Sequence, residues 1–85
     1  MGKLEEARPL YEEAVQARRE TLGDRHPDTL TSISNMGSLQ QEMGKLKEAR
    51  LLYEEAVQGS KETLGDRHPH TLIFTEHLDF LLKYC

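Results

Sequence analysis

The stretch GKLEEARPLYEEAVQARRETLGDRHPDTL at residues 2–30 recurs as GKLKEARLLYEEAVQGSKETLGDRHPHTL at residues 44–72, with 23 of 29 positions identical. The segments that follow, 31–43 and 73–85, share only Leu39 and Leu81. Two copies of one 42-residue unit, 2–43 and 44–85, therefore fill the chain without a gap. Because a period of 20–50 residues is typical of solenoids and arrays, the sequence predicts a single repeat domain over residues 1–85.

Each unit is expected to form two helices, because its apolar residues recur at three- and four-residue steps. Gly23 is expected to end the first helix in a left-handed conformation, and Pro27 to begin the next. Gly37, inside the second helix, is expected to permit a close approach of a neighbouring helix. The alternative is a tolerated glycine that costs the helix about 1 kcal/mol. We therefore expect helices at about 3–22, 28–43, 45–64 and 70–84. The predicted fold class is all-α, an antiparallel helix-turn-helix solenoid of four helices.

The composition limits the partners that this chain can have. Its net charge is −4, with 31% charged and 36% apolar residues, which is typical of a soluble protein with a modest core. The acidic balance argues against nucleic acid or an anionic membrane as partner, and no apolar run is long enough to span a bilayer. Since the chain opens without a signal-peptide core and Cys85 is its only cysteine, we expect a cytoplasmic protein.

Two segments carry a resemblance to a known family. The string GKLKEARLLYEEA at 44–56 resembles a signature of the tetratricopeptide repeat, and GDRHPDTL at 23–30 is similar to the linker between its helices. The unit resembles the 42-residue variety found in kinesin light chains and nephrocystin-3-like proteins. By this resemblance, residues 29–43 form a first helix (A) and 46–64 a second helix (B). The chain then reads B–A–B–A, with one intact repeat between two halves.

The resemblance implies a peptide-binding groove lined by the A helices. Carried over residue by residue, the groove candidates are Ser34, Asn35, Ser38 and Gln41. An asparagine at position 35 can donate to and accept from a peptide backbone at once. The second copy has His77 at the position of Asn35, so the asparagine is not repeated. The alternative interpretation is a solvated polar face.

No set of residues with catalytic, cofactor-binding or metal-binding spacing stands out. His26 and His68 belong to the repeated linker, and together with His70 they supply too few ligands for a typical zinc site. Gly23–His26 lacks the Lys-Ser/Thr ending of a phosphate loop. Cys85 is the last residue, a poor place to hold a nucleophile. We therefore expect no enzyme activity, no cofactor and no metal.

The ends of the chain predict self-association, because a repeat unit cannot bury its apolar stripe alone. In the last helix, five polar positions of the first copy become apolar or aromatic, and Asp79 replaces Gly37, which weighs against equally close packing there. The self-association candidates are Leu4, Leu10, Tyr11, Ile73, Phe74, Leu78, Phe80, Leu81, Leu82 and Tyr84. Three arrangements are open: a head-to-tail stack, a symmetric dimer through the last helix, and an exchange of halves by fusion across Gly44.

The predicted function is a protein–protein interaction scaffold that binds a peptide or helix in its groove and forms a homo-oligomer, either a dimer or a head-to-tail stack. One alternative is a C-terminal capping segment of a longer array with no binding activity of its own. Another is a part of a multidomain enzyme whose active site lies elsewhere.

Overall fold

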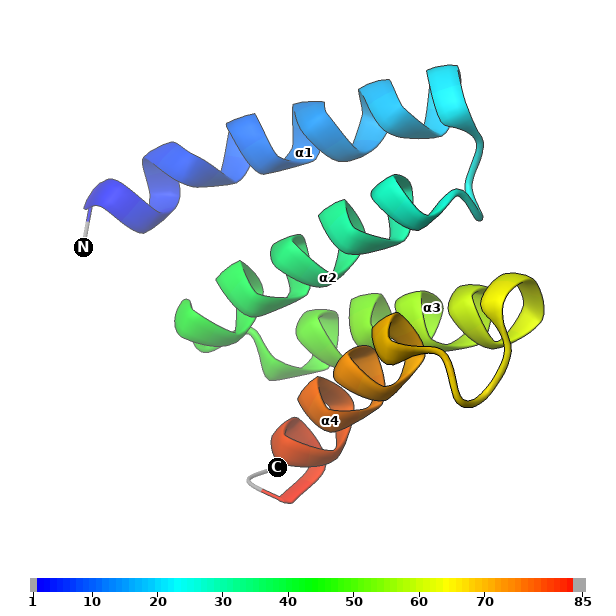
Figure 1. Ribbon diagram of the computed structural model, residues 1–85. Helices are drawn as coiled ribbons and strands as arrows, with labels where there is room; N and C mark the ends of the chain where they lie inside the picture. Colours follow the sequence, from blue (N-terminus) through cyan, green and yellow to red (C-terminus); the bar gives the residue numbers. More distant parts are fainter. Residues whose placement is uncertain (1, 84–85) are drawn as a thin grey trace.

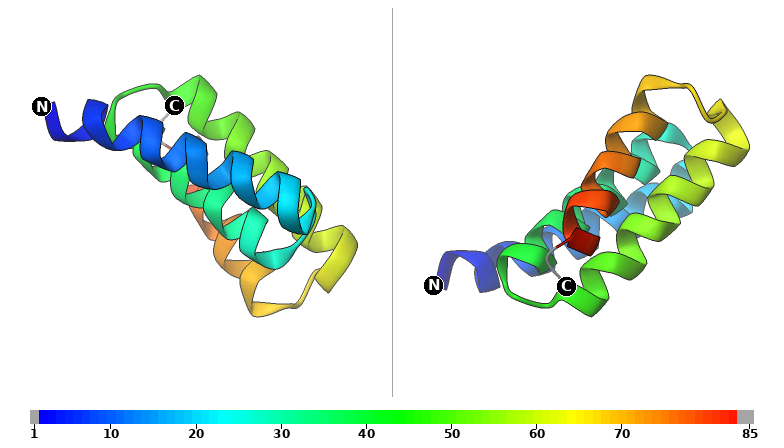
Figure 2. Two further views of the ribbon diagram at one scale, coloured as in Figure 1. Left: turned by 90° about the horizontal axis from the view of Figure 1, so that it is seen from above. Right: turned by 90° about the horizontal axis from the view of Figure 1, so that it is seen from below.

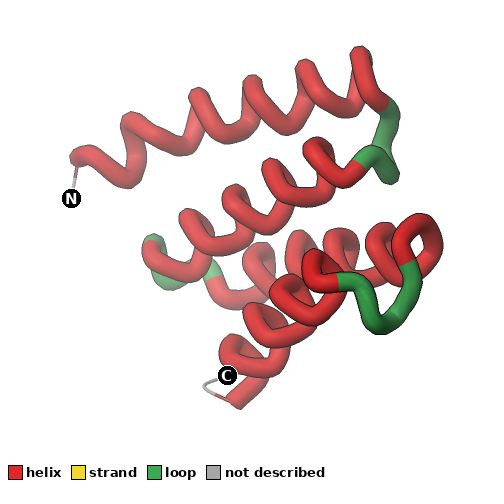
Figure 3. The backbone as a smooth tube through the Cα atoms, viewed as in Figure 1, coloured by secondary structure: helices red, strands yellow, loops and turns green. Residues whose placement is uncertain are grey.

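The computed structural model describes residues 2–83 and consists of four helices joined by short turns (Figures 1 and 3). The helices are α1 (Gly2–Leu22), α2 (Pro27–Glu42), α3 (Leu46–Leu64) and α4 (Pro69–Lys83). Each boundary lies within one residue of the range expected from the sequence. The described part contains no strand, and the predicted all-α helical repeat fold is confirmed.

Glycines end the first three helices with positive φ angles. Gly23 and Gly65 occupy equivalent positions in the two copies, with φ of 95° and 94°. Gly44 has φ of 81°, and its N–H donates to the carbonyl of Gln41 while the N–H of Lys45 donates to that of Gln40. This pair of bonds is a Schellman motif, which satisfies carbonyls at the end of α2. Fusion of α2 and α3 across Gly44 would have to break both bonds.

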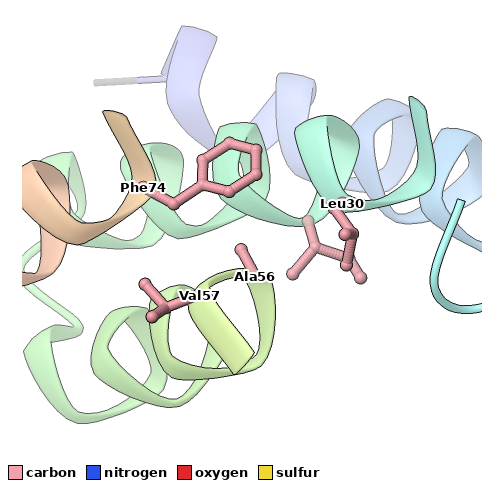
Figure 4. Close-up of a cluster of buried hydrophobic side chains, with 5 residues drawn as sticks. Leu30, Ala56, Val57 and Phe74 are labelled. Carbon is pink, nitrogen blue, oxygen red and sulfur yellow. The ribbon is translucent and has the colours of Figure 1, made fainter. Parts of the chain in front are cut away.

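The helices form a flat layer of 37 × 33 × 16 Å. α2 lies between α1 and α3 (Figure 1), and α4 packs on α3 (Figure 2). Two apolar clusters hold the layer together. The first contains Leu30, Ile33, Ala56, Val57 and Phe74 (Figure 4). The second contains Ala49, Tyr53 and Leu81. Leu78 packs against both clusters, so α4 is anchored along its length.

The burial of α4 corrects one expectation about the self-association candidates. Phe74 and Leu81 were expected on the outward face, but they are 4% and 1% exposed because α4 turns them onto α3. Each large apolar side chain buried in this way contributes about 1.5–3 kcal/mol. Asp79, in contrast, is exposed, so the charge that replaces Gly37 is not part of this buried contact.

Candidate functional site

Tyr53 lies at the junction of α2, α3 and α4 and gathers three of the predicted groove residues around it. Its hydroxyl donates to Oε1 of Gln41 at 3.1 Å and lies 2.9 Å from Oγ of Ser38. Because the Tyr53 proton goes to Gln41, Ser38 is the donor in the second bond. Ser34 lies nearby, with Oγ 3.2 Å from Nδ1 of His77, whose ring centroid is 5.6 Å from that of Tyr53.

These bonds give three groove candidates a structural role. Ser34 is buried at 2% exposure, and Ser38 and Gln41 are half-buried. Their polar groups tie α2 to α3 and α4, so a ligand in the groove would have to compete with these internal bonds for Ser38 and Gln41. Their role in peptide binding stays a prediction, as does that of the fourth candidate.

Asn35, the fourth candidate, is exposed and lies against α1. It lines two small hollows of about 230 and 190 Å³, both shared with Tyr11. Tyr11 and Asn35 occupy the positions of Tyr53 and His77 in the other copy, so the two pairs are related by the repeat. Tyr11 is 40% exposed, whereas Tyr53 is 2% exposed, because only Tyr53 has an A helix on both sides.

The remaining self-association candidates divide between the two ends of the layer. On α1, Leu10 is 67% exposed, while Leu4 is half-buried. On α4, the exposed apolar side chains are Leu72, Ile73, Phe80 and Leu82, and Leu78 is half-buried. Tyr84 lies outside the described residues. Leu72 was not among the candidates, although its exposure is similar.

Two glycines allow α2 and α3 to approach closely. A Cβ atom at Gly37 would lie 2.9 Å from Cε1 of Tyr53, and one at Gly59 would lie 2.6 Å from Cδ2 of Leu30. Both positions are therefore restricted to glycine unless neighbours move, which confirms the close approach predicted at Gly37. The equivalent residues in the other copy are Asp79 and Ala17, so neither end of the chain keeps this feature.

α1 and α3 are linked by an ion pair that was not among the sequence predictions. Arg19 donates from Nη1 and Nη2 to the two carboxylate oxygens of Glu55, at 2.7 and 3.1 Å, and from Nη1 to Asp24 at 3.1 Å. The bond to Glu55 outweighs desolvation and raises the pKa of Arg19 above its ordinary value. A bidentate pair of this kind fixes both distance and orientation between the helices.

A groove of about 380 Å³ lies along the same helices and is formed by α1, α2 and α3. Apolar side chains make up most of its lining: Val15, Met36, Leu51 and Leu52. Glu12, Gln40 and Glu48 complete it. We call this the α1–α3 groove. The ion pair between Arg19 and Glu55 lies beside this groove. Its one signal in the sequence is a difference between the copies, because Arg19 of the first unit corresponds to Lys61 of the second.

The linker histidines cap helices. Nδ1 of His26 accepts from the N–H of Asp28 at 3.0 Å, and Nδ1 of His68 accepts in the same way from His70. A nitrogen used in this way is not free to bind a metal. Within residues 2–83, no three His, Cys, Asp or Glu side chains cluster closely enough to hold a metal ion. No helix in this range is long and apolar enough to cross a membrane.

A comparison with family models matches the tetratricopeptide repeat over residues 1–62. The match covers α1, α2 and all but the last two residues of α3, and so includes nearly all of the A–B pair formed by α2 and α3. A search of curated proteins found no match. The all-α arrangement of four helices in the described residues is consistent with this match. The chain therefore belongs to the tetratricopeptide repeat family.

Proposed function

We propose that this chain is a protein-binding scaffold of the 42-residue variety seen in kinesin light chains, and that it associates with a second copy of itself. Tetratricopeptide repeats typically mediate protein–protein interactions. The observation that carries the proposal is the exposed apolar surface of α4. Ile73 and Phe80 are 46% and 55% exposed, whereas α2 has Thr31 and Ser38 at the same positions.

A symmetric dimer fits this surface better than a head-to-tail stack. Stacking α4 on α1 of the next copy would repeat the α2–α3 contact, with Asp79 and Ala17 in place of its two glycines. A side chain at either position would meet the facing helix at less than contact distance, as the Cβ distances at Gly37 and Gly59 indicate. The α2–α3 geometry therefore disfavours the stack.

Two-fold pairing of α4 avoids this obstacle. Ile73 and Phe80 are seven residues apart and share one helix face, while Asp79 is turned about 100° away from Phe80. In an antiparallel pair, Ile73 of one copy would pack against Phe80 of the other, twice in each dimer. Such a contact removes four large apolar side chains from water, the main driving force in protein association.

Sedimentation of the full chain tests this proposal. We expect a species of twice the 9.8 kDa chain mass, and a shift to the single-chain mass in Ile73→Glu and Phe80→Glu. Leu10→Glu is the matched control, because Leu10 is even more exposed but lies at the other end of the layer. A single-chain mass at all concentrations would contradict the dimer and favour a capping role. Equal dissociation in the Leu10 variant would contradict the assignment to α4.

Peptide capture beside Asn35 is a second candidate, supported by the exposure of this residue next to two hollows shared with Tyr11. A peptide-array signal that is lost in Asn35→Ala would support it. A signal that survives this substitution would place the peptide elsewhere on the molecule.

A further inference from the structure

The α1–α3 groove has the size and the lining of a binding site. Its volume of about 380 Å³ lies within the range of roughly 300–1,000 Å³ that is typical of ligand sites. Val15 and Leu52 belong partly to the core below, whereas Leu51 is 55% exposed at the surface. The groove therefore offers an apolar bed that continues from the core to solvent.

Gln40 gives the groove an unused hydrogen-bond acceptor. The residue is 8% exposed, and its Oε1 atom is buried without a hydrogen-bond partner. A buried acceptor left unsatisfied costs about 1–3 kcal/mol. Because the terminal amide torsion of glutamine is soft, a small rotation can turn the oxygen toward a donor that enters the groove. The site thus favours an occupant that carries an N–H group.

The charges around the groove determine which sign of charge the occupant can carry. Glu12 of α1 and Glu48 of α3 line it from opposite helices, and no Lys or Arg is among its lining residues. Two carboxylates beside an apolar bed attract a cation and repel an anion. A lysine side chain fits the apolar lining, the acceptor of Gln40 and the two carboxylates, because its stem is apolar and its cationic ammonium group is a donor.

The ion pair between Arg19 and Glu55 fixes the groove at one end. Arg19 lies one turn beyond Val15 on α1, and Glu55 lies one turn beyond Leu51 on α3. Because the two bonds hold these helices at a set separation, the groove is formed before a partner binds. Binding to a preformed site is more favourable, because less free energy is needed to order the protein.

We propose that the α1–α3 groove binds a helical segment of a partner protein that presents a leucine and a lysine one turn apart. The leucine would lie on the apolar bed. The lysine would lie between Glu12 and Glu48, with its ammonium group donating to Oε1 of Gln40. This site is separate from α4 and does not depend on dimer formation.

Three alanine-based helical peptides test the proposal: one with Leu and Lys four residues apart, one with Glu in place of the Lys, and one with Ala in place of the Leu. Binding to the full chain is measured by fluorescence anisotropy and located by the amide signals of Gln40, Leu51 and Leu52 in NMR spectra. We expect the Leu–Lys peptide to bind at least about tenfold more tightly than either of the others, a difference that the charge and apolar contacts can supply.

The repeat provides matched control variants. The double variant Glu12→Gln, Glu48→Gln should lower the affinity for the Leu–Lys peptide by about tenfold at low salt, because both carboxylates are lost. Glu54→Gln with Glu6→Gln removes the same number of charges at the equivalent, exposed positions and should leave binding unchanged. Gln40→Leu keeps the groove filled, and thermal unfolding checks its folding. The Gln40→Leu variant should have a lower affinity for the Leu–Lys peptide and an unchanged affinity for the Leu–Glu peptide.

Several results would overturn this assignment. Equal affinity for the three peptides, or no binding at millimolar concentration, would show that the groove does not select this occupant. Signal changes confined to α4 would place binding on the proposed dimer surface. Concentration-dependent changes at Leu51 and Leu52 without peptide would identify a second copy as the occupant. Repeating the titration with the Ile73→Glu variant separates the groove from the dimer, because the two proposals can then fail independently.

Discussion

Gly37 of α2 lies directly against the ring of Tyr53 in α3, so close that a Cβ atom would be 2.9 Å from Cε1 of the ring. Tyr53 is 2% exposed, and its hydroxyl is bonded to Ser38 and Gln41. The ring therefore has little room to move aside. This contact sets the spacing of α2 and α3 within the one intact repeat.

The first prediction is that Gly37→Ala destabilises the protein. Alanine gains about 1 kcal/mol in helix propensity, but overpacking against a fixed ring costs about 1–3 kcal/mol. We expect the free energy of unfolding to fall by about 1 kcal/mol in urea titrations. Gly37→Asp, which copies Asp79, should lower it further because it also places a charge in the contact.

A control for this prediction removes the ring. In a Tyr53→Leu background, Gly37→Ala should be neutral or stabilising, because the helix propensity of alanine is then no longer opposed. A stabilising effect of Gly37→Ala in the presence of Tyr53 would contradict the steric argument.

The fold could be predicted from the sequence because its determinants are local. The heptad-like spacing of apolar residues, Gly23, Pro27 and the 42-residue period specify helices and turns without long-range information. Gly37 was recognisable as a contact point for the same reason, since glycine inside a helix needs a packing explanation.

The surfaces were less predictable, because they depend on how helices rotate about their axes. Sequence spacing placed Phe74 with the outward residues of α4, yet the contact with α3 buries it. The groove candidates shared a helix face, but two of them bond to other helices. Ser34 bonds to His77, 43 positions further along the chain, and Ser38 bonds to Tyr53, 15 positions further along. The bond between Arg19 and Glu55 joins residues that are 36 positions apart in the sequence. Neither this bond nor the α1–α3 groove leaves a local sequence pattern, because both are formed by separate helices.

The second prediction concerns the two positions that disfavour stacking. The double variant Ala17→Gly, Asp79→Gly restores both glycines of the α2–α3 contact at the ends of the chain. We expect it to form assemblies larger than a dimer, because a head-to-tail contact is open-ended. Sedimentation at several concentrations measures this, with Ile73→Glu added to remove the symmetric contact.

Each single glycine variant serves as a control and should stack less than the double variant, since one side chain still obstructs the contact. Circular dichroism is needed as well, because each glycine costs about 1 kcal/mol of helix stability. An unchanged mass for the double variant would show that other features prevent the stack.

The third prediction is that the bidentate geometry of Arg19 matters more than its charge. Arg19→Lys copies Lys61 of the second unit and keeps the charge, but it loses one of the two bonds to Glu55. We expect a loss of about 0.5–1 kcal/mol in unfolding free energy. A double-mutant cycle with Glu55→Gln should show the coupling, and it should shrink at high salt.

Arg25 and Glu62 provide the matched comparison for this pair. Their charged atoms are 3.5 Å apart, and both side chains are nearly half exposed. Arg25→Lys should therefore change stability by less than Arg19→Lys. Equal losses of unfolding free energy in the two variants would mean that the pair of Arg19 and Glu55 stabilises the protein no more than an ordinary surface ion pair.

The fourth prediction is that His26 acts as an N-cap and can be replaced by serine, another capping residue. Its Nδ1 satisfies the N–H of Asp28 in the first turn of α2, where backbone N–H groups lack helical partners. His26→Ala should lower the unfolding free energy by about 0.5–2 kcal/mol, whereas His26→Ser should preserve it because serine accepts the same bond. His68 caps α4 in the same way, so the same pair of substitutions there should give the same ordering in thermal unfolding. If alanine and serine destabilise position 26 equally, the histidine acts through packing and not through the cap.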